Sequence, residues 1–395
     1  MTGFLLGHAT HPDWHLAAEL VLAQIEGQAS AAGRPMARST LGLVYATPAL
    51  APYYSEIATH LRIRTGVVDW VGTVGLAIAA TGVTYTDEPA LVVMLCHFPS
   101  GSVRVFSGQH RLPGAGDPFH RNAAAALVHA DPATPDLVEL IADLWDQTGS
   151  SHLFGGIGSG LERPPQQANQ TVFGGITGAL FSSEVAFLSR LSQGCTALGP
   201  PHIIAQCDTH YLKRLDDQPA LDAMLEDLGV APEQRATRDG RALLRALPGR
   251  RIRHGLLVGL APQASDPPSG RGFGDWAVRA VLGIDPVERV VAIADTPAAG
   301  DRLVFCTRDH DSAHQDLIRI CTELRDEIET RDLTIRGGLY VSCTARGAHL
   351  FGDAGSEIRL IANQLGDFPL AGFFANGEFM GARVYGHTGV LTLFI

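Results

Sequence analysis

The chain has 395 residues, a formal net charge of −11, 46% hydrophobic residues and 18% charged residues. This length exceeds what one ordinary core needs, so we expect more than one domain. The acidic balance argues against a nucleic-acid partner, and no apolar run reaches the roughly 20 residues of a membrane helix. The N-terminal residues lack the pattern of a signal peptide. We therefore expect a cytoplasmic protein without a membrane or nucleic-acid partner.

Three stretches of the chain share one pattern, and the first of these, copy one, covers residues 41–98. Its apolar run at 41–48 predicts a strand. The segment 53–62 predicts a helix with Tyr54, Ile57, Ala58 and Leu61 on one face. The run WVGTVGLAI at 70–78 and an apolar strand at 90–98 complete the copy.

Copy two covers residues 124–181 and begins with a strand-like run at 124–132. Thr134 and Pro135 predict the start of a helix, as N-cap and first helical residue. The predicted buried stripe of this helix is Leu137, Val138, Ile141, Leu144 and Trp145. The runs LFGGIGSGL at 153–161 and TVFGGITGALF at 171–181 follow.

Between copies two and three, the sequence departs from this pattern. We expect paired strands at 202–216, a short helix ended by Gly229, and several strands up to residue 307. Residues 255–295 are a candidate for a worn fourth copy. A long amphipathic helix follows, with Asp309 or Asp311 as its cap.

Copy three covers residues 337–395 and begins with GGLYVSCTARG at 337–347. The helix predicted at 356–366 is ended by Gly366. The run LAGFFANGEF at 370–379 and a last strand at 389–395 follow. The alternative to a true repeat is coincidence among glycine-rich apolar segments.

The spacing within the copies supports the repeat. It is 27 positions from Tyr45 to Gly72 and from Val128 to Gly155, and 31 from Val341 to Gly372. Each copy therefore reads strand, helix, strand, strand, and we expect the last two strands to be antiparallel neighbours. The predicted fold is α+β, with helix-covered mixed sheets in two lobes.

The glycine run at 155–160 resembles a phosphate loop but departs from it at the defining positions. The third glycine is misplaced for G-x-G-x-x-G, a pair of prolines follows, and no lysine completes a Walker loop. Two readings remain and are compatible. Either these glycines serve strand ends with unusual backbone angles, or Gly155, Gly156 and Gly158 let a ligand approach the backbone N–H groups.

The histidines do not predict a metal site. His11 and His15 in HATHPDWH are placed to share a helix face, but we find no third firm ligand nearby. In RDHDSAHQD at 308–316, the Asp and Ser residues are those of a helix cap. We expect no metal and no other cofactor.

The best nucleophile candidate is Cys343, at the end of a predicted strand. The adjacent Arg346 would favour a thiolate, and His349 is close in sequence as a base. A buried structural thiol is the commoner role of such a residue. The six cysteines include no C-x-x-C pair, so we expect no disulfides.

Arg346 and Glu378 stand at the ends of two predicted strands of copy three. A cation and a carboxylate on one rim suit a zwitterionic ligand, with Arg346 facing its carboxylate and Glu378 its ammonium. The alternative is that the two side chains form a salt bridge with each other.

Copy three resembles the C-terminal part of the FIST family, whose name denotes F-box and intracellular signal transduction proteins. The resemblance rests on YVSCTARG, PLAGFFANGEF and GHTGVLTLF. Copies one and two resemble the N-terminal FIST domain, so we expect the N-terminal domain at 1–215 and the C-terminal domain at 216–395. Two departures stand out. The family often has Asn-Gly where this chain has Thr344 and Ala345, and it favours His where Tyr385 stands.

The resemblance implies a sensory module for small ligands, with amino acids as the ligand class proposed in bacteria, and a stand-alone bacterial form here. We favour ligand binding over catalysis, with a small polar metabolite held by strand-end loops. The residues expected to bind it are Cys343, Arg346, Gly347, Asn376, Gly377, Glu378, Gly155, Gly156 and Gly158. A cysteine enzyme using Cys343 and a protein-recruiting scaffold are the alternatives. A homo-oligomer or a separate signalling partner would receive the signal. Binding would order the proline-rich loops at 164–170, 232–241 and 261–272.

Overall fold

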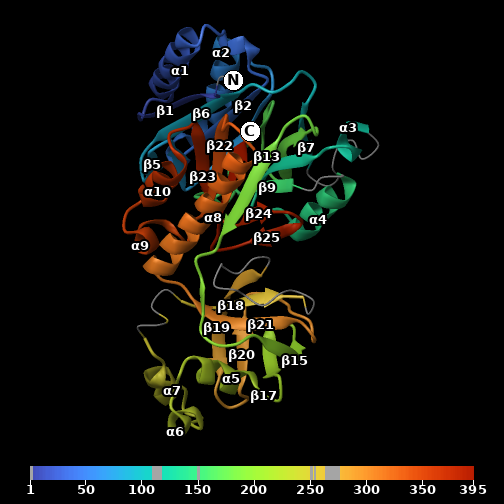
Figure 1. The fold of residues 1–395 in the computed structure, drawn as a ribbon, viewed down its shortest axis with the longest axis vertical. Helices are drawn as coiled ribbons and strands as arrows, with labels where there is room; N and C mark the ends of the chain where they lie inside the picture. The colour runs from blue at the N-terminus through green and yellow to red at the C-terminus, as the bar shows by residue number, and fades with distance from the viewer. Residues whose placement is uncertain (1–2, 109–117, 149–151, 250–251, 253–254, 263–275) are drawn as a thin grey trace. The chain divides into compact units, whose positions relative to one another are not determined.

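The computed structural model in Figure 1 describes residues 3–108, 118–148, 152–249, 252, 255–262 and 276–395. The chain forms two compact units. The repeat unit is Met1–Ser192 with Ile320–Ile395, and the inserted unit is Gln193–Arg319. The α+β class and the two-lobed organisation are confirmed. The expected sequence-domain boundary at 215 and 216 falls inside the inserted unit and stays a prediction.

Among its described residues, the repeat unit contains three mixed sheets of six strands each. Copies one, two and three supply the three central strands of the first, second and third sheet respectively. The first sheet, in pairing order, is β1 (Leu5–Thr10), β6 (Ala90–Cys96), β2 (Leu41–Ala46), β3 (Trp70–Val74), β10 (Gln166–Ala168) and β11 (Thr171–Val172). The second is β7 (Val103–Gly108), β12 (Ile176–Phe181), β8 (Ala125–Ala130), β9 (His152–Ile157), β24 (Glu378–Met380) and β25 (Arg383–Tyr385). The third is β13 (Phe187–Ser192), β26 (Gly389–Phe394), β22 (Gly337–Cys343), β23 (Leu370–Ala375), β4 (Ala77–Ala80) and β5 (Val83–Thr86).

The strand, helix, strand, strand order holds in all three copies, but the predicted pairing of the last two strands is wrong. The first two strands of each copy are parallel neighbours: β2 with β3, β8 with β9, and β22 with β23. The last strands, β6, β12 and β26, run antiparallel on the other side of the first strand. A crossover helix returns the chain in the same direction, so the first strand is central in every copy.

Each copy also donates a hairpin to the sheet of another copy. Copy one places β4 and β5 beside β23, copy three places β24 and β25 beside β9, and copy two places β10 and β11 beside β3. The exchange is therefore cyclic. It splits the runs at 70–78 and 370–379 between two sheets, although the sequence suggested one element in each. It also makes part of the expected loop at 164–170 a strand.

The three crossings from one sheet to the next meet at Ser159. Its hydroxyl donates to the Phe374 carbonyl and accepts from the Leu76 N–H at 2.8 Å. Its own N–H donates to the Val74 carbonyl at 3.2 Å. One residue of copy two thus joins the crossings of copies one and three, and the glycine-rich segments converge there.

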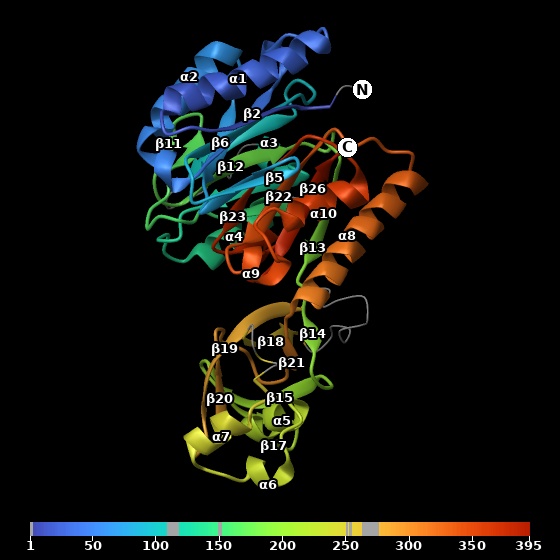
Figure 2. The same ribbon diagram turned by 90° about the vertical axis from the view of Figure 1, so that its left-hand side faces the viewer.

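Helices cover the outer faces of the sheets, as Figures 1 and 2 show for α1 and α2 over the first sheet and α9 and α10 near the third. The helices of the repeat unit are α1 (Trp14–Ala31), α2 (Tyr54–Thr65), α3 (Pro118–Arg121), α4 (Leu137–Gln147), α9 (Gly347–Phe351) and α10 (Ser356–Leu365). The predicted face of α2 is buried, and Gly366 ends α10 with φ 82°. The start of α4 is not as predicted: Asp136, not Thr134, precedes its first turn, and Val138 is 63% exposed. No helix among the described residues is long and apolar enough to cross a membrane.

The inner faces of the three sheets share one core, to which each sheet contributes aromatic rings. Tyr45, Phe154 and Phe373 come from the first, second and third sheets and are buried. The Tyr45 ring stacks on Phe373 with centroids 5.1 Å apart. Tyr45 also meets His129, with 3.1 Å between the hydroxyl and Nε2, and burial lowers the pKa of His129 to about 3. Copy three therefore folds against copies one and two.

The inserted unit is an antiparallel sheet whose pairings close into a ring: β21 with β15, then β16, β20, β19, β18 and β21 again. Its strands are β14 (Thr196–Ala197), β15 (His202–Asp208), β16 (Tyr211–Leu215), β17 (Gln218–Pro219), β18 (Leu256–Ala261), β19 (Ala277–Asp285), β20 (Val290–Ile293) and β21 (Arg302–Thr307). Its short helices are α5 (Ala220–Asp227), α6 (Pro232–Arg235) and α7 (Gly240–Ala246). The prediction of a fourth copy at 255–295 is wrong, because its described strands, β18, β19 and β20, make antiparallel pairs in place of the parallel pair that marks each copy.

The predicted long helix is α8 (His310–Thr330), which crosses the boundary between the units in sequence. Of the two residues predicted to cap it, Asp309 is the N-cap, because its Oδ1 accepts the Ser312 N–H at 2.8 Å. The segment 232–241 forms α6 and the start of α7, and most of the expected loop at 261–272 lies outside the described residues. All six cysteines are described, and none is in a disulfide.

Candidate functional site

The repeated glycines are required by the parallel strand pairs. Gly72, Gly155 and Gly372 lie opposite Val44, Val128 and Tyr340 in the three copies. A Cβ atom at these glycines would lie 1.8, 1.9 and 2.1 Å from the carbonyl oxygens of those partners. No side chain fits at such a distance, so these glycines serve the fold in every copy.

The predicted binding glycines come together as strand partners. Gly155 and Gly156 of β9 pair with Phe379 and Glu378 of β24, and the Gly377 carbonyl accepts the Ile157 N–H at 2.9 Å. The Gly158 N–H donates to the Ala130 carbonyl at 2.9 Å. Copy three thus brings Glu378 directly against the glycine run of copy two, and the backbone there is used largely for sheet pairing.

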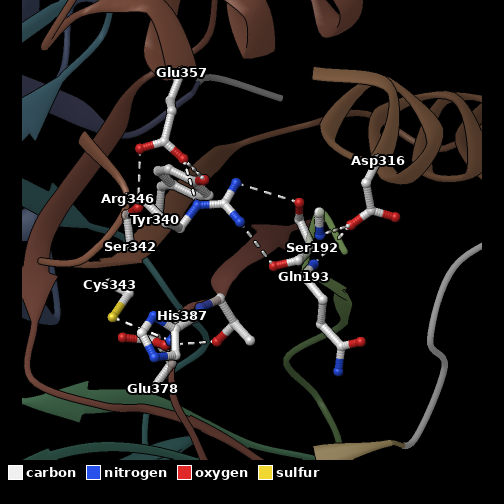
Figure 3. Close-up of polar contacts among 12 residues, drawn as sticks. Ser192, Gln193, Asp316, Tyr340, Ser342, Cys343, Arg346, Glu357, Glu378 and His387 are labelled. Atoms are coloured by element: carbon white, nitrogen blue, oxygen red, sulfur yellow. Dashed lines mark hydrogen bonds and ion pairs between the residues drawn. The ribbon is translucent and has the colours of Figure 1, made fainter. Parts of the chain in front are cut away.

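Arg346 is fully buried and is held by a second acidic residue, Glu357 (Figure 3). Its Nε lies 2.8 Å from Glu357 Oε1, and its Nη1 and Nη2 donate to Ser192 O and Oγ at 3.1 and 3.3 Å. Tyr340 and Ser342 donate to the same carboxylate at 2.7 and 3.0 Å. Burial, followed by the Glu357 charge, raises the pKa of Tyr340. Both ions therefore have hydrogen-bonded partners, as buried charges require.

The burial of Glu357 could not be predicted from the sequence. Glu357 is in the first turn of α10 and is 1% exposed. An acidic residue in a first turn is equally typical of a solvent-exposed charge that the helix dipole stabilises. The proposed alternative, a salt bridge between Arg346 and Glu378, is not found, since Arg346 pairs with Glu357.

Glu378 is the buried acid whose hydrogen bonds are incomplete. It is 0% exposed, and its Oε2 accepts from the Thr388 N–H at 3.1 Å and hydroxyl at 2.6 Å. Within the described part of the chain, Oε1 has no partner of ordinary hydrogen-bond geometry. Burial raises the pKa of Glu378 to about 8, although Thr388, the Arg346 charge and the Cys343 thiol lower it. At neutral pH this carboxyl is therefore mostly protonated.

Cys343 lies beside Glu378 and receives a hydrogen bond from His387. The backbone N–H of His387 donates to Cys343 Sγ at 3.2 Å (Figure 3). His387 has φ 63°, a left-handed backbone that a residue with a Cβ adopts at some cost. Sequence reasoning named His349 as the base near Cys343, and the side chain of His349 lies outside the described part of the structure. His387 itself was missed because 44 residues separate it from Cys343.

The exposed edge of this cluster is polar. Asn376 is exposed, and its Oδ1 accepts from the Thr344 hydroxyl at 3.3 Å. Gly347 begins α9 with φ 62°. We call Cys343, Thr344, Asn376, Glu378 and His387 the copy-three cluster.

Comparison with known proteins identifies the family. The FIST N domain model matches residues 40–218 and the FIST C domain model matches residues 220–381. Together they cover most of the chain. The chain belongs to the FIST family. Domains of this family are linked to sensing in signal transduction.

Relatives in mycobacteria are similar over most of their length. Two uncharacterized proteins, one of Mycobacterium tuberculosis and one of Mycobacterium bovis, are each 28% identical over 341 residues, covering 82% of both chains. Another uncharacterized protein of Mycobacterium tuberculosis is 28% identical over 338 residues, covering 82% of this chain and 83% of its own.

The two departures from the FIST pattern lie at the copy-three cluster. Thr344 donates to Asn376, and Tyr385 is the strand partner of Glu378. Tyr385 therefore adjoins the buried acid, and Thr344 contacts Asn376 at the exposed edge of the cluster.

Proposed function

We propose that the chain is a sensory protein that binds a small polar ligand, an amino acid or a related metabolite, at the copy-three cluster. The observation that supports this most strongly is the buried, incompletely hydrogen-bonded carboxyl of Glu378. A buried polar atom without a partner costs about 1–3 kcal/mol, so a ligand that supplies a donor to Oε1 gains that amount.

The chemistry of the cluster favours a ligand with an amine or amide donor. An ammonium group facing Glu378 would draw the proton from the carboxyl, because a nearby positive charge favours the ionised form. Binding would then release a proton at neutral pH. Arg346, already held by Glu357 and Ser192, would position strand β22 rather than bind the ligand carboxylate.

Access to Glu378 requires a change of conformation, since the carboxyl is fully buried. The segment with His387 is suited to this change, because its left-handed backbone holds strain that a rearrangement would release. A ligand that binds the rearranged state better shifts the equilibrium toward it. We propose that a second copy or a separate cytoplasmic partner reads this shift.

A thermal-shift panel of amino acids and related metabolites tests the proposal. A ligand at 100 times its Kd adds about 2.7 kcal/mol of stability. Glu378→Gln should abolish the shift, and Asp131→Asn, which changes a buried acid of copy two, should keep it. Absence of any shift across the panel, or an equal shift in Glu378→Gln, would contradict the proposal.

A cysteine-dependent enzyme is the second candidate, because the Glu378 carboxyl lies at the Cys343 thiol and the backbone N–H of His387 donates to its sulfur. A nucleophilic cysteine needs a thiolate and a base within hydrogen-bond reach. Iodoacetamide labelling at neutral pH, followed by peptide mass mapping, separates the candidates. Rapid labelling of Cys343 that His387→Ala slows favours the enzyme, and an unreactive Cys343 favours the sensor.

A further inference from the structure

A cluster of metal-ligating side chains lies on the outer helices of the repeat unit, away from the residues discussed above. It consists of His15 and Glu19 on α1 and His60 on α2. Each offers one ligand atom, and these atoms all lie within 4.8 Å of one another.

The start of α1 fixes two of the three residues. Asp13 caps the helix, and its Oδ1 accepts the His15 and Leu16 N–H groups at 2.8 and 3.2 Å. His15 and Glu19 are therefore one turn apart on the same face of α1. His11 precedes the helix, so the expected pairing of His11 with His15 on a helix face is wrong, and Glu19 takes that place.

The third residue comes from the neighbouring helix. His60 Nε2 lies 2.6 Å from Glu19 Oε1, and the His15 and His60 ring centroids are 4.8 Å apart. Zinc bonds to His nitrogen and carboxylate oxygen are about 2.0–2.2 Å long, which places tetrahedral ligand atoms about 3.3–3.5 Å apart. One ligand-atom pair is 2.6 Å apart and no pair is more than 4.8 Å apart, so side-chain rotations can bring the three atoms to that spacing.

The helices that carry these ligands are fixed by their buried faces. Ala18, Leu22, Ile57 and Leu61 are buried beneath the cluster's two helices. The Trp14 ring lies 5.5 Å from His15 and 6.1 Å from His60, measured between centroids. Ligands on rigid elements are held close to a productive geometry.

Arg64 is the group that competes with a metal ion here. It forms ion pairs with both Glu19 and Glu26, the latter at 3.2 Å. Glu26 can therefore keep Arg64 when a metal ion takes Glu19. The Glu19 carboxylate also has a second oxygen, so the pair with Arg64 and a metal bond are compatible.

We propose that His15, Glu19 and His60 bind a divalent first-row transition metal ion such as Zn²⁺. Two imidazole nitrogens and one carboxylate oxygen are a common donor set for zinc, and three protein ligands leave one position for water. The ion would join α1 to α2, and it would add stability because the unfolded chain lacks the assembled site.

Titration of the chelator-treated full chain with ZnCl₂, followed by calorimetry and thermal unfolding, tests this. We expect one zinc ion per chain and a higher Tm. His15→Ala, Glu19→Gln and His60→Ala should each weaken zinc binding by more than about tenfold, whereas His11→Ala, the matched control, should not. His15 is exposed, so His15→Ala remains informative if a variant at His60 fails to fold.

Cobalt provides a second measurement on the same variants. Co²⁺ bound by two imidazoles and a carboxylate gives visible absorption that His15→Ala removes. No zinc binding by the wild-type chain, or equal binding by wild type and His15→Ala, would overturn the proposal. The second result would identify adventitious surface binding only.

Discussion

Copies two and three place different chemistry at the same point of the fold. Asp131 directly follows β8 and Cys343 is the last residue of β22, and each stands three residues after the strand partner of the required glycine. Each accepts an N–H from the segment before the last strand, from Gly174 at 2.9 Å and from His387 at 3.2 Å. Gly174 and His387 both have left-handed backbones, with φ 78° and 63°.

The two copies differ in how completely their buried acid, Asp131 or Glu378, is hydrogen-bonded. Asp131 accepts the Ala133 and Gly174 N–H groups through its two oxygens. Copy three has a thiol there instead, buries Glu378 beside it, and places a histidine where copy two has glycine. The same strand arrangement thus holds a hydrogen-bonded structural acid in copy two, whereas copy three buries a thiol beside an acid whose Oε1 has no hydrogen-bond partner among the described residues.

Replacing the required glycine should destabilise the protein equally in copies two and three, and this is the largest expected effect. Gly155→Ala and Gly372→Ala should each cost well above about 3 kcal/mol, because the obstructing atom is a backbone oxygen. Gly27→Ala in α1 is the control: no atom lies within 4 Å of its Cβ position, so it should stabilise by about 0.5–1 kcal/mol. Chemical denaturation of the three variants measures this. A soluble and stable Gly372→Ala variant would contradict the prediction that both copies require this glycine.

Removal of the arginine side chain should cost much more stability in copy three than in copy two. Arg346→Ala leaves Glu357 buried without its cation and should cost about 3–5 kcal/mol. Arg163, whose side chain is 60% exposed and lies 3.8 Å from Asp131, should cost less than about 1 kcal/mol as Arg163→Ala. Urea unfolding gives both values. Similar costs would mean that the Arg346 network is not the structural support of copy three.

Glu378→Gln should stabilise the chain at pH 8 by about 1–3 kcal/mol. Glu378 has a pKa of about 8 when folded, above its ordinary value of 4.5, so the folded chain binds the proton more tightly. Its contribution to stability is full below pH 4.5 and falls between pH 4.5 and 8, by up to about 1.4 kcal/mol per pH unit. Glu378→Gln should remove this part of the pH dependence. An unchanged profile would mean that Glu378 is ionised.

The left-handed residues give the smallest expected effect. Gly174→Ala should cost about 1–2 kcal/mol, because a Cβ is unfavourable at φ 78°. His387→Gly should be neutral or stabilising by less than about 1 kcal/mol, since the strain it relieves is offset by added freedom of the unfolded chain. Thermal unfolding checks both. A large loss in His387→Gly would mean that the His387 side chain stabilises the fold rather than straining it.

The repeat itself was predictable from the sequence, but the arrangement of the copies was not. Gly72, Gly155 and Gly372 leave a signal because a close approach of two strands tolerates no other residue. The hairpin exchange leaves none, since β4 is a short, wholly apolar and buried strand whose sequence does not show which sheet it joins.

The site divides in the same way. Cys343, Asn376 and Glu378 were found because they end predicted strands of one copy. Glu357 and His387 were not, because their roles depend on packing across the copy. Glu19 was within reach of the i, i+4 rule, whereas His60 comes from a second helix.

The most direct test of the central claim is the ionisation of Glu378. Carbon-13 NMR of a chain labelled at glutamate carboxyls can follow each titration, with Glu378→Gln to assign the resonance. We predict a midpoint near pH 8 for Glu378 and a downward shift when a ligand with an amine donor binds. A midpoint near the ordinary value of 4.5 would contradict the account of a buried, protonated acid that awaits a ligand.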